Sequence, residues 1–134
     1  MPLEFPPIVM IETGIVTDNI EPMVSFYKEV LGLPFLEEVR YPGGSQHRFS
    51  CGTAIVKILR FDVPPTVGLP PGGPSGGAKG VRYLTFKIQN VRQIVEEVRA
   101  AGYGVPQEPF QFAPDLMVAF VQDPDGNWIE LYGR

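Results

Sequence analysis

The sequence predicts an α+β protein built from two βαβββ modules, and two observations support this fold class. A segment rich in glycine and proline divides the chain, and the same order of strand and helix signals occurs on both sides of it. Positions 64–80 hold five prolines and six glycines, a density that excludes a helix or a central strand. We therefore expect a single domain over 1–134, made of a first module (1–63), a Gly/Pro-rich linker (64–80) and a second module (81–134).

The first module begins with an apolar segment of strand character over 8–16. Thr17-Asp18-Asn19 is a helix start, and apolar residues at helical spacing predict a helix from Ile20 to Leu31. Gly32 is the expected C-terminal cap of that helix. Three shorter strands are predicted to follow, over 35–40, 46–50 and 53–60.

The second module repeats this order. A strand over 81–88 precedes a helix that starts after Asn90 and stops at Gly102, and strands follow over 103–108, 116–122 and 127–132. Asn19 and Asn90 are 71 positions apart, and the two terminal glycines are 70 apart. Because so few short strands do not make a stable sheet alone, we expect the two modules to pack together.

Composition and charge exclude several classes of protein. The chain is 44% hydrophobic and 19% charged, which excludes a wholly disordered chain. A net charge of −4 without a basic cluster argues against nucleic acid as a partner. The longest apolar run, Leu116 to Val121, is far too short for a membrane span, and no signal peptide is recognisable. The lone cysteine, Cys51, is expected to be a small buried hydrophobe in a soluble cytoplasmic protein.

Two passages resemble signatures of the vicinal oxygen chelate superfamily. Positions 26–33, FYKEVLGL, resemble its F-Y-x-x-x-L-G-L helix motif, and positions 123–131, DPDGNWIEL, resemble its D-P-x-G-N-x-x-E-L ending. The superfamily includes glyoxalase I, extradiol dioxygenases, methylmalonyl-CoA epimerase, and fosfomycin and bleomycin resistance proteins. The resemblance implies the glyoxalase/bleomycin resistance/dioxygenase fold, in which two βαβββ modules pack into a concave mixed sheet. It also implies a small-molecule ligand or substrate and a homodimer.

The resemblance further implies where metal ligands would lie in the metal-using members: on the first and fourth strands of the first module, and on the first and last strands of the second. This sequence places Glu12, Lys57, Tyr83 and Glu130 there. A lysine ammonium repels a cation, and a neutral phenol is a poor metal ligand. We therefore expect no metal cofactor, and a cluster in which one glutamate acts as a base while Lys57 or Tyr83 steadies an enolate.

Five further residues are candidates for binding the substrate. His47 is the only histidine, and Arg48 follows it on a predicted strand, so one of the two should point inward and could hold an anion. A surface position is the default for the histidine. Prolines at both ends of 109–114 predict a loop whose Phe110 and Phe112 line a pocket mouth or an interface. Trp128 is the fifth candidate for binding the substrate.

Three functions remain open at this point. The first is a metal-free acid/base enzyme, a lyase, isomerase or dioxygenase-like protein that uses the four residues at the ligand positions. The second is a protein like the bleomycin resistance members, which sequester drugs without catalysis in acidic, aromatic-lined clefts; the pI near 4.9 suits it. The third is a metalloenzyme in which Glu12, Glu130 and His47 hold a divalent metal.

Overall fold

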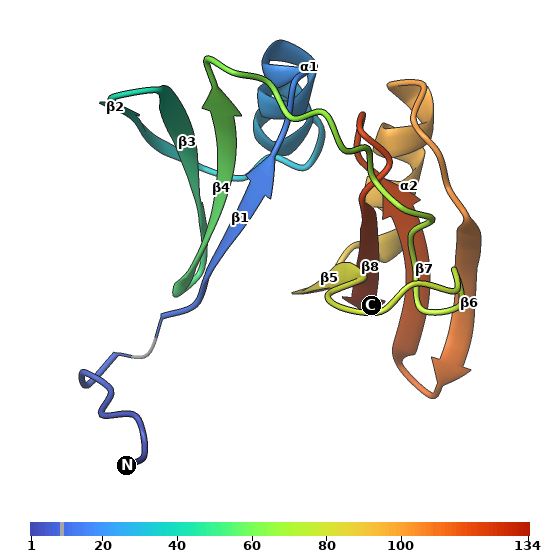
Figure 1. Ribbon diagram of the computed structural model, residues 1–134. Helices are drawn as coiled ribbons and strands as arrows, with labels where there is room; N and C mark the ends of the chain where they lie inside the picture. The colour runs from blue at the N-terminus through green and yellow to red at the C-terminus, as the bar shows by residue number, and fades with distance from the viewer. Residues whose placement is uncertain (9) are drawn as a thin grey trace. The chain divides into compact units, whose positions relative to one another are not determined.

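The computed structural model describes residues 1–8 and 10–134, and these form two compact units, Met1–Thr66 and Val67–Arg134. Each unit contains a helical segment and a four-stranded sheet (Figure 1). Both units have the βαβββ order, so the predicted α+β class is confirmed. The boundary between the units falls inside the predicted linker.

In the first unit, a helix covers one face of a mixed sheet. The elements are β1 (Glu12–Val16), α1 (Ile20–Ser25), the π-helical turn η1 (Phe26–Val30), β2 (Phe35–Tyr41), β3 (Gly44–Cys51) and β4 (Ala54–Phe61). The strand order is β1-β4-β3-β2, with β1 parallel to β4 and the other pairs antiparallel. We call the face that carries α1 and η1 the helix-covered face, and the opposite one the helix-free face.

The core of the first unit lies under the helix. Phe26 and Tyr27 are consecutive and both fully buried, and the Tyr27 ring packs 6.4 Å from the ring of Phe49 on β3. A π-type bond from the Leu31 N–H to the Phe26 carbonyl widens the turn that carries them. Gly32 then ends the helix with φ +73°, as the sequence predicts, because glycine adopts this conformation without steric cost.

The second unit has the same layout. It consists of β5 (Tyr83–Ile88), α2 (Val91–Ala100), β6 (Gln107–Ala113), β7 (Leu116–Gln122) and β8 (Trp128–Gly133), in the sheet order β5-β8-β7-β6. The buried valines of α2 face the sheet, on the side where Ile129 and Leu131 are buried. Among the described residues, no helix has the length and apolar character needed to cross a membrane.

The predicted start of the first strand is wrong, whereas the predicted starts of both helices are confirmed. The first strand begins at Glu12 rather than at position 8, because β4 offers partners only from Ile55 onward; Ile8 and Ile11 are exposed, and Val9 lies outside the described residues. Asn19 and Asn90 occupy the N-cap positions of the two helices, although neither side chain bonds to the backbone there. The Asn90 amide instead donates to Gln93 Oε1 at 3.1 Å.

The expected loop at 109–114 is also wrong, because most of it belongs to β6. The predicted strand over 103–108 lies largely before this element, which spans Gln107–Ala113. β6 is an edge strand whose pairing with β7 shifts register twice. An edge position tolerates Pro109 because the backbone on the outer side of an edge strand forms no hydrogen bonds with a neighbouring strand. Phe110 and Phe112 are nevertheless exposed, as expected.

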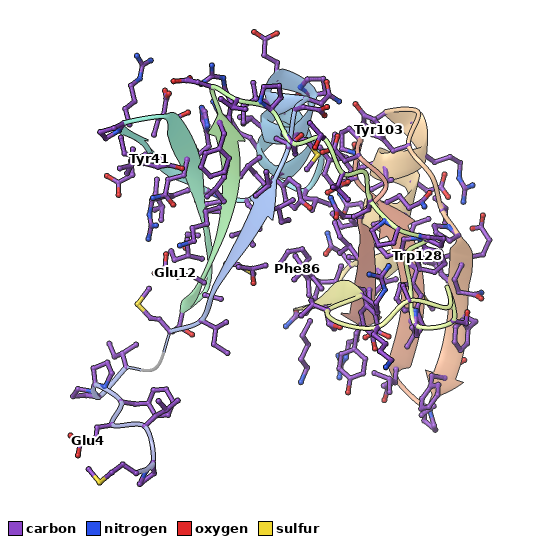
Figure 2. All side chains as sticks on the ribbon, viewed as in Figure 1. Glu4, Glu12, Tyr41, Phe86, Tyr103 and Trp128 are labelled. Carbon is purple, nitrogen blue, oxygen red and sulfur yellow. The ribbon has the colours of Figure 1, made fainter. Side chains whose placement is uncertain are left out.

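The second half of the predicted linker packs onto the second unit. The backbone at Gly72 and Gly73 lies against the Trp128 indole: a Cβ would sit 2.4 Å from an indole atom at Gly72 and 2.6 Å at Gly73. Gly73 also has φ +78°, so a side chain there would be strained as well as crowded. The Arg82 guanidinium donates to the Pro71 carbonyl. This segment is therefore a strap over Trp128 as well as a connection between modules (Figure 2).

Candidate functional site

Three charged side chains meet on the helix-free face of the first unit. Lys57 of β4 is aligned with Gly14 of β1 on one side and with Arg48 of β3 on the other, so Gly14, Arg48 and Lys57 share this face. Arg48 Nη2 lies 2.6 Å from Glu12 Oε1, and Lys57 Nζ lies 3.8 Å from the same oxygen. Gly14, which has no side chain, leaves room beside the Lys57 stem. Of the predicted cluster of Glu12, Lys57, Tyr83 and Glu130, the first unit thus brings Glu12 and Lys57 together, with Arg48 as the closer partner of Glu12.

The cluster is partly open to solvent, which suits a site that must admit a ligand. The exposed fractions of the side chains are 38% for Glu12, 28% for Lys57 and 19% for Arg48. Arg48 is also oriented by its neighbours, since its Nη1 donates to Gln46 Oε1 at 3.4 Å and its Nε lies 3.6 Å from Glu37 Oε1. Sequence reasoning missed Gln46 and Glu37 as partners of Arg48. Side chains alternate between the two faces along β2 and β3, and this alternation is a signal that could have identified them.

His47 points the other way. It precedes Arg48 on β3, aligns with Ile58 of β4, and shares the helix-covered face with Phe49. Its side chain is only 18% exposed, so it is not the surface histidine that is the default expectation, and Nε2 lies 3.8 Å from Glu38 Oε2. Glu12 and His47 are therefore on opposite faces of one sheet, and the structure does not bring them together.

The second unit carries the remaining candidates on the face opposite α2. Register pairs Tyr83 with Trp128 and Thr85 with Glu130. Thr85 Oγ1 donates to Glu130 Oε1 at 2.9 Å. Phe120 of β7 packs against both aromatic residues, with ring centroids 5.3 Å from Tyr83 and 5.4 Å from Trp128. Glu130 is thus a polar group beside an aromatic surface.

The exposed phenylalanines extend this surface toward the sheet edge. Phe110 pairs with Val118 of β7, which lies on the same face as Phe120, and the Phe110 and Phe112 rings are 6.5 Å apart. Their role in a pocket or an interface stays a prediction.

The fold and both sequence signatures can be compared with known proteins. The sequence model of the Glyoxalase/Bleomycin resistance protein/Dioxygenase superfamily matches residues 8–131. The chain belongs to this superfamily. The family resemblance drawn from the two motifs is therefore confirmed, and the fold class agrees with it.

Individual superfamily relatives match at low identity. YraH of Bacillus subtilis (strain 168), named an uncharacterized protein, is 27% identical over 128 residues, which cover 92% of this chain and 96% of that protein. Lactoylglutathione lyase GLX1 of Arabidopsis thaliana is 29% identical over 117 residues, which cover 87% of this chain but only 41% of that enzyme. The chain therefore spans less than half the length of the plant relative.

Solved structures of the superfamily share the fold. A glyoxalase family protein from Bacillus cereus matches with a TM-score of 0.82 at 18% identity, over 98% of this chain and 97% of that one. Glyoxalase I from Zea mays matches with a TM-score of 0.75 at 19% identity, over 93% of this chain and 44% of that one. At these identities the similarity concerns the fold alone.

Glu12 and Lys57, which the family resemblance places at metal-ligand positions of the first unit, do not fit a divalent cation. Glu12 is the single carboxylate there, and two cationic side chains surround its Oε1. A metal at this point would have to displace Arg48 and overcome repulsion from Lys57. The described residues contain no group of three or more His, Cys, Asp or Glu side chains that could hold a metal ion. We derive no metal-dependent step from this site.

Cys51 ends β3 and is half-buried. Burial raises the pKa of its thiol because desolvation disfavours the thiolate. We therefore expect the rate of iodoacetamide alkylation to become half-maximal at a higher pH than for free cysteine, since only the thiolate reacts. The pH dependence of alkylation, followed by mass spectrometry, tests this. A midpoint at or below that of glutathione would contradict it.

Proposed function

We propose that this superfamily member is a metal-independent small-molecule enzyme that moves a proton next to a carbonyl group. The observation that supports this is the shared Glu12 carboxylate, held by Arg48 at 2.6 Å and by Lys57 at 3.8 Å. A carboxylate with an open side is a base, and two fixed cations beside it stabilise negative charge that develops in a bound substrate.

The chemistry of these side chains favours a small 2-oxo or 3-oxo carboxylic acid as substrate. The planar guanidinium of Arg48 suits a carboxylate, which it binds with two parallel hydrogen bonds. Lys57 would face the carbonyl oxygen and Glu12 the adjacent C–H. Glu12 takes the proton, the C–H electron pair forms the enolate C=C bond, and the carbonyl electrons move to the oxygen beside Lys57. Return of the proton to either face of the carbon completes an exchange or an isomerisation.

Ligand sequestration is the second candidate, and the aromatic surface of the second unit favours it. Tyr83 and Phe120 pack edge to face, and Phe120 packs at a tilt against Trp128, on the face that carries Glu130. A flat cationic drug would find Tyr83, which is 38% exposed, as a stacking partner and Glu130 as a carboxylate, whereas the strap already covers the Trp128 indole. The homodimer and the cytoplasmic location expected from the sequence also remain predictions.

Proton exchange in D₂O tests the proposed enzyme without knowledge of its full reaction. We expect the protein to catalyse deuterium incorporation at the carbon next to the ketone, which is C3 of pyruvate or 2-oxobutyrate and C2 of acetoacetate. This exchange is measured by ¹H NMR and should persist after dialysis against EDTA. Loss of exchange on chelation with recovery on adding Fe(II) or Ni(II) would contradict the metal-independent reading. Tight binding of a cationic glycopeptide drug, without exchange on any oxo acid, would favour sequestration.

A further inference from the structure

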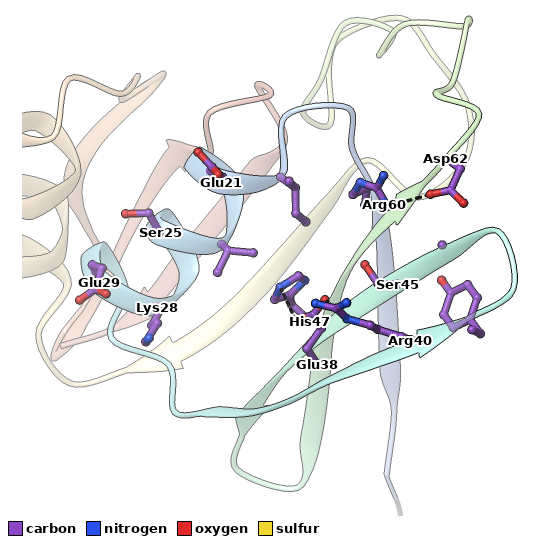
Figure 3. A pocket seen from close by; sticks show the side chains of 14 residues that line it. Glu21, Ser25, Lys28, Glu29, Glu38, Arg40, Ser45, His47, Arg60 and Asp62 are labelled. Atoms are coloured by element: carbon purple, nitrogen blue, oxygen red, sulfur yellow. Dashed lines mark hydrogen bonds and ion pairs between the residues drawn. The ribbon is translucent and has the colours of Figure 1, made fainter.

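The helix-covered face of the first unit contains a pocket that the proposed function does not use. It has a volume of about 680 Å³ and lies between α1 with η1 and strands β2, β3 and β4 (Figure 3). That volume is within the usual range for small-molecule sites. The Glu12–Arg48–Lys57 cluster lies on the opposite face of the same sheet, so the two sites are independent.

The sheet wall of this pocket carries a row of three polar residues. Register aligns Arg40 of β2 with Ser45 of β3, and Ser45 with Arg60 of β4. Neighbouring strands are about 4.8 Å apart, so a buried hydroxyl is flanked by two guanidinium-bearing side chains. Ser45 is 6% exposed. His47 lies in the next row, on the same wall.

Each arginine is tethered by one carboxylate and keeps most of its donors. Arg40 Nε donates to Glu38 Oε1 at 3.2 Å, and Arg60 Nη1 lies 3.1 Å from Asp62 Oδ1. A guanidinium has five N–H donors, so each of these pairs uses only a part of them. Within the described part of the chain, the terminal nitrogens of Arg40 make no hydrogen bond. The Arg40 and Arg60 side chains are 83% and 45% exposed, so their remaining donors are open to solvent and to a ligand.

The histidine adds to this wall a buried atom without a partner in the described part of the chain. His47 Nδ1 is buried and, among the described residues, has no hydrogen-bond partner. Buried polar atoms in folded proteins are seldom left unpaired. Arg40, Ser45, Arg60 and His47 together offer donors from three adjacent strands to one region of the pocket.

The helix wall has a different character. Ile20 and Val24 supply apolar surface, and Glu21 and Glu29 have no ion-pair partner among the described residues. Figure 3 shows both glutamates on the helix, across the pocket from Arg40 and Arg60. Lys28 lies on the same wall and would attract an anion, and the apolar side chains favour a hydrophobic body.

We propose that this pocket is a second ligand site, which binds a small molecule with one phosphate or carboxylate group and an apolar body. The anionic group contacts Arg40, Ser45 and Arg60, because guanidinium groups bind both kinds of oxyanion through paired hydrogen bonds. The apolar body lies against Ile20 and Val24.

Phenyl phosphate and benzoate are suitable probes, and benzyl alcohol is the neutral analogue with the same ring. His47 and Trp128 are the only histidine and the only tryptophan, so their ring resonances report separately on the pocket and on the second unit. We expect phenyl phosphate or benzoate to shift the His47 imidazole signals saturably, with no shift of the Trp128 indole and none from benzyl alcohol. Whichever of the two anions binds with the higher affinity identifies the preferred anionic group.

Variants separate this site from the proposed active site. The double variant Arg40→Gln/Arg60→Gln should weaken anion binding by about tenfold or more, whereas Arg92→Gln, an equal loss of charge on α2, should not change it. Glu12→Gln should keep the His47 shift even where it abolishes proton exchange. Absence of a saturable shift in the unmodified protein, or unchanged affinity in the double variant, would overturn the proposal.

Discussion

Replacing Glu12 with glutamine is expected to lower the rate of α-proton exchange by about 10²- to 10⁴-fold, the usual contribution of a positioned general base. Glutamine keeps the shape of the side chain and an oxygen that can accept from Arg48, but it cannot take the proton. Because the Glu12 side chain is 38% exposed, the fold should tolerate this change. The measurement is the initial rate of deuterium incorporation by ¹H NMR at saturating oxo acid.

Glu37→Gln is the matched control. Glu37 also contacts Arg48, at 3.6 Å, but its side chain is 61% exposed, and an exposed ion pair contributes about 0–1 kcal/mol. We expect its exchange rate to change by less than about fivefold. Lys57→Met should reduce exchange while leaving Glu12 available as the base. Equal rates in Glu12→Gln and Glu37→Gln would exclude Glu12 as the base.

The helices and the last hairpin were predictable because their sequence signals are local. The apolar residues of α2 repeat at helical spacing, and Gly102 supplies the positive φ that ends the helix. The strand predicted over 116–122 coincides with β7. In each case the determining interactions lie within a few residues of each other in the chain.

The errors in the predicted elements arose where distant residues decide the outcome. Pro109 is a strand residue because β6 happens to be the sheet edge, which no local pattern reveals. The expected strand before Glu12 fails because β4 provides no partner there. The Gly72–Gly73 strap depends on contact with Trp128, more than fifty residues later in the chain.

The candidate site was predictable in part for the same reason. Alternation on β3 requires His47 and Arg48 to face opposite ways, but only the register with β4 shows that Arg48 shares a face with Lys57. Once that register is known, Glu12 and Arg48 form a pair and His47 belongs to the pocket under the helix. The family resemblance proposed Glu12 and Lys57, whereas the position of Arg48 between Glu12 and Glu37 depends on the strand register of the sheet.

Replacing Asp123 with alanine is expected to lower the free energy of unfolding of the second unit by about 2–4 kcal/mol. Asp123 is 2% exposed. Its Oδ1 accepts from the backbone N–H groups of Asp125 and Asn127 at 3.0 and 2.9 Å, and its Oδ2 accepts from Asn127 Nδ2 at 2.8 Å. Alanine would leave these donors without their acceptor in the turn that joins β7 to β8.

Urea denaturation followed by the fluorescence of Trp128 measures this loss directly, since the only tryptophan begins β8 immediately after the turn. Asp123→Asn is the matched control: its carbonyl oxygen can still accept from the two backbone N–H groups, but its amide cannot accept from Asn127 Nδ2. We expect an intermediate loss for this variant. If alanine costs less than about 1 kcal/mol, the backbone conformation of Pro124 and Gly126 holds the turn, and the shape of the turn does not depend on the carboxylate.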